Sequence, residues 1–94
     1  MTEDEFKIEI EKIISGLSSA GFASVDSQTI ENLDKFAAAA NDLGMKEGGK
    51  LITNLSAAMK AIREGKSQAE SGEIRLTALD FYVKKLSSGN TEDL

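Results

Sequence analysis

The chain has 94 residues, with sixteen acidic and eleven basic side chains, and its formal net charge is −5. It contains no cysteine, histidine or proline. The length predicts one domain with one modest core. The missing residue types exclude thiolate chemistry and remove the commonest general base and metal ligand, so we expect neither a cofactor nor a metal site. The negative charge argues against nucleic acid and anionic lipid as partners.

The N-terminal stretch predicts a cytoplasmic location. MTEDEFKIEIEK is acidic, whereas a secretory signal begins with positive charge followed by an apolar run. No run of ~18 apolar residues is present, so no membrane span is expected.

The first helix is predicted between Thr2 and Gly21. Thr2 and Glu5 have the spacing of a capping box, in which each side chain bonds the backbone N–H of the other residue. Gly21 is typical of a helix C-terminus because glycine readily adopts a left-handed conformation. Ile8 falls off the apolar stripe. Five residues at helical spacing form that stripe: Phe6, Ile10, Ile13, Ile14 and Leu17.

The second helix is predicted to begin at Asp26 or Ser27 and to end at Gly44. As the N-cap, Asp26 would accept a hydrogen bond from a backbone N–H of the first turn. Val25 and Ile30 then occupy the two positions of a hydrophobic staple. Six residues form its predicted core face: Ile30, Leu33, Phe36, Ala37, Ala40 and Leu43.

The third helix is predicted between the glycine pair Gly48–Gly49 and Gly65, with the pair in a loop. Its start has no good cap. Its stripe comprises Leu51, Leu55, Ala58 and Ile62, flanked by Ile52 and Met59.

The fourth helix is predicted to begin between Ser67 and Glu73 and to run to about Leu86. The domain therefore spans residues 1–87, followed by a polar tail, residues 88–94, that we expect to be disordered. One apolar stripe forms the predicted core face: Leu76, Leu79, Val83 and Leu86. A second set lies outside it and is called the candidate oligomer face: Ile74, Ala78, Phe81 and Tyr82.

Four amphipathic helices joined by short connections favour antiparallel neighbours. No stretch alternates between apolar and polar residues for long enough to predict a strand. The predicted fold is all-α, an up-down-up-down antiparallel four-helix bundle.

Four consecutive alanines lie in the middle of the second helix, in LDKFAAAANDLGM over residues 33–45. At about 100° per residue, Ala37 and Ala40 fall on the core face. The rest of the run borders solvent and leaves a shallow surface that another helix could approach closely. Alternatively, alanine is present only for its high helix propensity. We call this candidate partner-binding surface the alanine edge: Asp34, Lys35, Ala38 and Asn41.

The stretch DKFAAAANDLG resembles the relay helix of a histidine-containing phosphotransfer domain, the four-helix bundle of bacterial phosphorelays. That motif reads approximately histidine, any residue, leucine, lysine, glycine, a small residue, alanine, three further residues and glycine. Asp34 falls on the histidine, Phe36 on the leucine and Ala37 on the lysine. Ala38 and Gly44 fall on the two glycines.

This resemblance covers about residues 6–87 and implies that the alanine edge docks a receiver domain. It also implies that phosphotransfer has been lost, because an aspartate stands in place of the histidine and Ala37 in place of the phosphoryl-binding lysine. The carboxylate of Asp34 would face the acidic pocket of a receiver, which argues against the family's usual pose. The implied function is a non-catalytic signalling adaptor or decoy.

The alternative function is a self-associating structural helical protein. Apolar positions of the fourth helix cover roughly 200° of its wheel, whereas a bundle stripe needs about 100°. Two-fold homodimers are the commonest oligomers, so the candidate oligomer face is a plausible dimer contact. A competing explanation is that Phe22, Val25 or the N-terminal segment covers it.

An enzymatic function is not expected. The sequence contains no nucleophile motif, phosphate-binding loop or metal-ligand spacing. The expected partner is a protein, either a receiver domain or a second copy of the chain, with no nucleic acid and no membrane.

Overall fold

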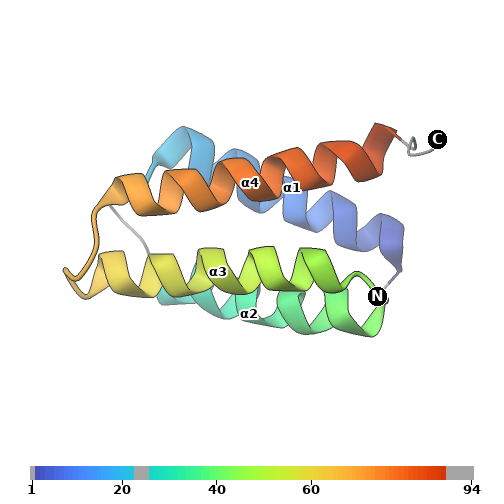
Figure 1. Cartoon of the computed structure of the whole chain (residues 1–94), viewed down its shortest axis with the longest axis horizontal. Helices are drawn as coiled ribbons and strands as arrows, with labels where there is room; N and C mark the ends of the chain where they lie inside the picture. Colours follow the sequence, from blue (N-terminus) through green and yellow to red (C-terminus); the bar gives the residue numbers. More distant parts are fainter. Residues whose placement is uncertain (1, 23–25, 89–94) are drawn as a thin grey trace.

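A computed structural model describes residues 2–22 and 26–88, which form an antiparallel bundle of four α-helices (Figure 1). Successive helices run in opposite directions, so the predicted up-down-up-down bundle is confirmed. Within the described residues there is no strand, and no helix is both long enough and apolar enough to cross a membrane. The helices are α1 (Glu3–Ala20), α2 (Ser27–Asp42), α3 (Lys46–Arg63) and α4 (Ala69–Ser88).

The starts of α1 and α2 follow their predicted caps. The Glu5 backbone N–H donates to Thr2 Oγ1 at 3.1 Å, and the Thr2 N–H donates to Glu5 Oε1 at 2.9 Å. The bond from the Thr2 backbone lowers the pKa of the Glu5 carboxyl. Asp26 caps α2 by accepting the Thr29 N–H at 2.8 Å, which lowers the pKa of the Asp26 carboxyl. The Val25 half of the predicted staple lies outside the described residues.

The third helix begins earlier than predicted, and its glycine pair is helical. Gly48 and Gly49 lie in the first turn of α3, where the Gly49 N–H donates to the Met45 carbonyl at 3.0 Å. Both glycines are buried. A Cβ on Gly48 would lie 2.8 Å from the Tyr82 ring, and one on Gly49 would lie 2.7 Å from Asn41 Oδ1. The prediction of a loop here was wrong, because the pair serves close packing rather than helix termination.

The buried face of α3 is also turned relative to the prediction. Ile52, Leu55 and Met59 have no exposed surface, whereas Leu51 and Ile62 are only half-buried. The turn follows from the position of α3, which packs against α2 on one side and α4 on the other. The face between those two neighbours is therefore the one that enters the core.

One continuous core joins all four helices. Phe6 and Phe36 pack edge to face, with ring centroids 6.2 Å apart. Four residues predicted for the core face are instead only half-buried: Ile13, Phe36, Leu43 and Leu86. The core comprises Phe6, Ile10, Ile14, Leu17, Phe22, Ile30, Leu33, Ala37, Ala40, Ile52, Leu55, Met59, Leu76, Leu79 and Val83.

The fourth helix continues through Ser88, one residue into the segment predicted as a tail. Residues 89–94, where the disordered tail was predicted, lie outside the described residues.

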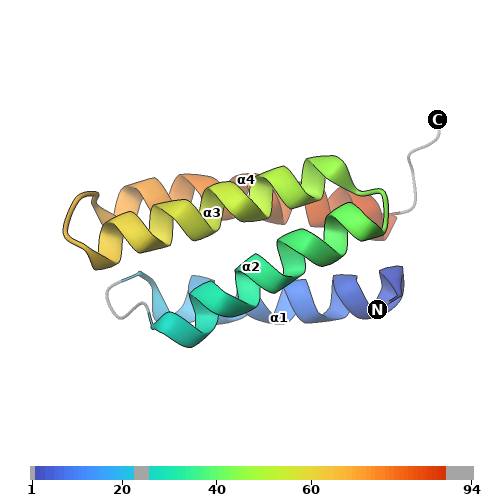
Figure 2. The same ribbon diagram turned by 90° about the horizontal axis from the view of Figure 1, so that it is seen from below.

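The helices do not pack equally tightly. α2 is inclined, so that its C-terminal half lies against the start of α3 (Figure 2). The α2–α3 and α3–α4 contacts are extensive, whereas α1 contacts α2 and α4 much less. α3 is therefore the central helix of the bundle.

We expect Gly49→Ala to destabilise the fold, by ~1–3 kcal/mol of unfolding free energy. The added Cβ would lie 3.2 Å from the Ala37 carbonyl oxygen, a backbone atom that cannot yield unless α2 moves. The matched control is Gly16→Ala on the exposed side of α1, where a Cβ meets nothing within 4 Å. That change should stabilise the protein by ~0.5–1 kcal/mol. Urea unfolding measures both, and stabilisation of equal size at the two sites would contradict the close packing.

Candidate functional site

The alanine edge lies partly within the contact between α2 and α3. Ser56 Oγ on α3 donates to Asp34 Oδ1 at 2.7 Å, and Lys60 Nζ lies 3.3 Å from Asp34 Oδ2. The Ser56 side chain is almost fully buried, with 1% of its surface exposed. The Asp34 carboxylate is half-exposed and is held by both partners. Its first role is therefore to satisfy a buried hydroxyl and to join the two helices.

The other end of the alanine edge also faces α3. The Asn41 side chain lies against Gly49, where a side chain on α3 would collide with it. The helix that approaches the small residues of α2 is thus α3 of the same chain. Lys35 and Ala38 are exposed, and Asp34 and Asn41 also keep exposed surface beside their contacts with α3. Sequence reasoning missed Ser56 and Gly49, although a serine near the buried stripe and a helical glycine pair were the available signals.

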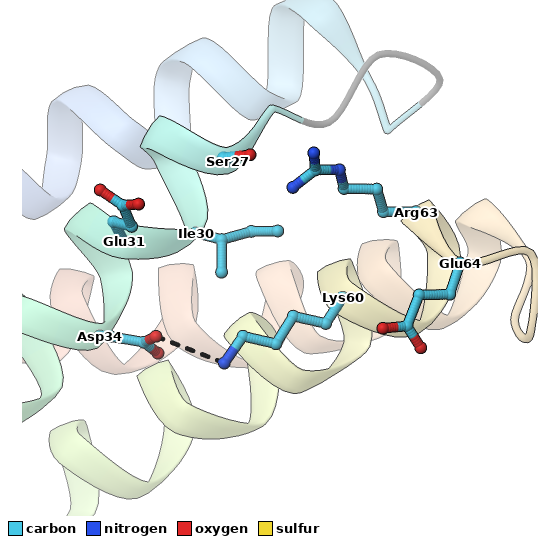
Figure 3. Close-up of a pocket in the computed structure, with 7 residues that line it drawn as sticks. All are labelled: Ser27, Ile30, Glu31, Asp34, Lys60, Arg63 and Glu64. Atoms are coloured by element: carbon cyan, nitrogen blue, oxygen red, sulfur yellow. Dashed lines mark hydrogen bonds and ion pairs between the residues drawn. The ribbon is translucent and has the colours of Figure 1, made fainter.

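A polar groove opens between the first half of α2 and the end of α3 (Figure 3). It encloses about 450 Å³ and contains three carboxylates and two cations. Arg63 reaches toward the start of α2, where it adds to the lowering of the Asp26 pKa. The mixed charges do not favour a ligand of one sign, and no cluster of metal-binding side chains forms within the described residues. The groove is lined by Ser27, Ile30, Glu31, Asp34, Lys60, Arg63 and Glu64.

The candidate oligomer face has a different character. Ile74 and Phe81 are 59% and 62% exposed, and Ala78 between them is also exposed. Phe22 does not cover these residues: it is buried, and its ring fills the space beside Gly72. Val25, another predicted cover, lies outside the described residues.

Tyr82 lies between this face and the core. Its ring packs on Gly48, and burial raises the pKa of its phenol, an effect that the Glu47 carboxylate reinforces. A shallow hollow beside it is lined by Leu51 of α3 together with Ala78 and Phe81. The exposed apolar surface of α4 therefore continues onto α3.

Comparison with known proteins finds no family model that matches the chain and no curated protein or solved structure significantly similar to it. The resemblance to a phosphotransfer domain consequently stays a prediction.

A double-mutant cycle tests the link between Asp34 and Ser56. We expect Asp34→Ala to cost ~1–3 kcal/mol of unfolding free energy, because it leaves the buried Ser56 hydroxyl without its acceptor. In the Ser56→Ala background the same change should cost ~1 kcal/mol less. The exposed neighbour Lys35→Ala should change stability by less than ~0.5 kcal/mol. If the changes in unfolding free energy, measured by urea unfolding, are strictly additive, the hydrogen bond between Ser56 and Asp34 is contradicted.

Proposed function

We propose that the chain is a non-catalytic helical protein-binding module whose contact surface is the candidate oligomer face of α4. The observation that carries this proposal is the exposure of Ile74 and Phe81 on one side of one helix, two turns apart. Half-buried Leu51 and Tyr82 extend the same apolar surface. Contiguous apolar surface of this kind marks a site of protein interaction more often than scattered single residues do.

The free energy that burial of Ile74 and Phe81 would contribute supports a contact surface. Covering the exposed parts of Ile74 and Phe81 would contribute about 2–4 kcal/mol, judged from the burial free energy of such side chains. Few substitutions on an ordinary surface change the free energy by as much.

The accessible chemistry supports a non-catalytic role. Ser56 and Asp34 have the spacing of a hydroxyl and an acceptor, but the Ser56 hydroxyl is buried between helices and out of reach of a substrate. Lys60 is engaged by the same carboxylate.

A signalling adaptor or decoy in a bacterial phosphorelay is the second candidate function. It is favoured by the exposure of Lys35 and Ala38, which leaves a flat strip on α2. A receiver docked there would meet Asp34 already engaged by α3, so we place this candidate second.

Affinity capture from a host lysate, with differently tagged copies included, compares the two surfaces. We expect Phe81→Asp to lose the protein that the wild type captures, because a carboxylate would be buried in an apolar contact. Ala38→Arg should retain it. The matched control is Ile8→Asp, since Ile8 on α1 is 52% exposed and equally apolar. Circular dichroism checks that every variant is folded. Loss of the captured protein with Ala38→Arg alone would favour the alanine edge as the contact surface. Loss of the captured protein with Ile8→Asp alone would overturn the proposal.

A further inference from the structure

The outer side of α4 carries a sequence that is symmetric in its apolar residues and antisymmetric in its charges. Reversing the helix about the point between Thr77 and Ala78 exchanges Ile74 with Phe81. The same reversal exchanges Glu70, in the first turn, with Lys85, in the last. We call this line of residues the α4 stripe: Glu70, Ile74, Thr77, Ala78, Phe81 and Lys85.

We propose that the partner of the candidate oligomer face is a second copy of this chain, with its α4 antiparallel to the first. The two-fold axis passes between Thr77 and Ala78. This inference rests on the proposed function and names the partner for the same face. An isologous contact requires a surface complementary to itself, and the α4 stripe meets that requirement.

In this register, apolar groups meet apolar groups and opposite charges meet. Ile74 lies against Phe81 of the second copy, and Glu70 lies against Lys85 of the second copy. The symmetry repeats each contact, so two apolar pairs lie between two ion pairs. Lys85 Nζ already lies 4.8 Å from the centroid of the Phe81 ring, at the end of the stripe where Glu70 of the second copy would arrive.

The centre of the α4 stripe suits a close helix–helix approach. Thr77 and Ala78 are small, and the Thr77 hydroxyl donates to the Glu73 carbonyl at 2.9 Å. That hydroxyl already has a partner within its own helix, so covering it leaves no polar group unsatisfied.

The charges also select the direction of pairing. A parallel pair would place Glu70 beside Glu70 and Lys85 beside Lys85, which is repulsive at both ends. Glu70 and Lys85 also suit the macrodipole of their own helix, so their positions alone do not require a partner. The exposed side chains of Ile74 and Phe81 between them do require a partner, and the charges then fix the antiparallel orientation of that partner.

The contact is expected to be weak. One pair of helices covers less than the ~1,200–2,000 Å² of a stable interface. We therefore expect a dissociation constant between about 10 μM and 1 mM.

Sedimentation equilibrium of the purified chain is the first test. The wild type should dimerise in the stated range, and Phe81→Asp should weaken the dimer at least ~10-fold. Ile8→Asp should leave it unchanged. A wild-type chain that stays monomeric at about 2 mM would overturn the inference, as would equal weakening by Ile8→Asp. If that monomer still loses its lysate partner with Phe81→Asp, the proposed function stands and the partner is another protein.

Charge reversal tests the register. Glu70→Lys or Lys85→Glu alone should weaken the dimer about 3- to 10-fold, because each change creates two like-charge pairs. The double variant should recover the wild-type constant within about twofold, since both pairs are restored with reversed sign. If the dimer of the double variant is weakened by the sum of the two single free-energy changes, the register is wrong.

The direction of pairing is measured with a spin label. The chain has no cysteine, so Lys84→Cys supplies a unique attachment point. In the antiparallel pair the two labelled positions are separated by about 20 Å along the helix axes, from ~13 residues at ~1.5 Å each. A parallel pair would bring them to the same level, so a distance near the interaxial ~8–10 Å would overturn the proposal.

Discussion

The close approach of α2 and α3 is the constraint on which the rest of the bundle depends. At their crossing, a Cβ on Gly49 would lie 3.2 Å from the Ala37 carbonyl oxygen and 2.7 Å from Asn41 Oδ1, closer than ordinary van der Waals contact. Farther along, the buried Ser56 hydroxyl reaches Asp34 across the same contact. Small side chains at one end and a satisfied hydrogen bond at the other hold the two helices in one register. Of the alanine run of α2, Ala37 lies at this contact and Ala40 lies in the core, whereas Ala38 stays exposed.

This contact also decides which surfaces remain for partners. α2 packs on one side of α3. On the opposite side of α3 the Tyr82 ring packs against Gly48, and this contact sets the rotation of α4 about its axis. In that rotation Leu79 and Val83 point inward and Phe81 points outward. Asp34 and Asn41 of the alanine edge contact α3, while Ile74 and Phe81 on the outer side of α4 stay uncovered by the described residues. The proposal that α4 carries the contact surface therefore rests on the packing of α3.

The parts of the fold that depend on local pattern could be predicted, and those that depend on tertiary contact could not. The capping box of Thr2 and the cap at Asp26 are signalled within a few residues, and the period of the apolar stripes gives the bundle. Because glycine disfavours helices, the sequence predicts a loop at Gly48 and Gly49, but the packing of α3 overrides that propensity. The Ser56–Asp34 bond joins residues 22 positions apart, which no local pattern reveals.

Pairing of α4 with a second copy is tested most directly by the change of backbone amide chemical shifts as the purified, isotopically labelled chain is diluted. We expect concentration-dependent shifts on the outer side of α4, between Glu70 and Lys85, with the amides of Asp34 to Asn41 unchanged. Shifts confined to Asp34 to Asn41 would contradict it, because the contact surface would then be the alanine edge. A spectrum that does not change with concentration would contradict pairing of α4 with itself.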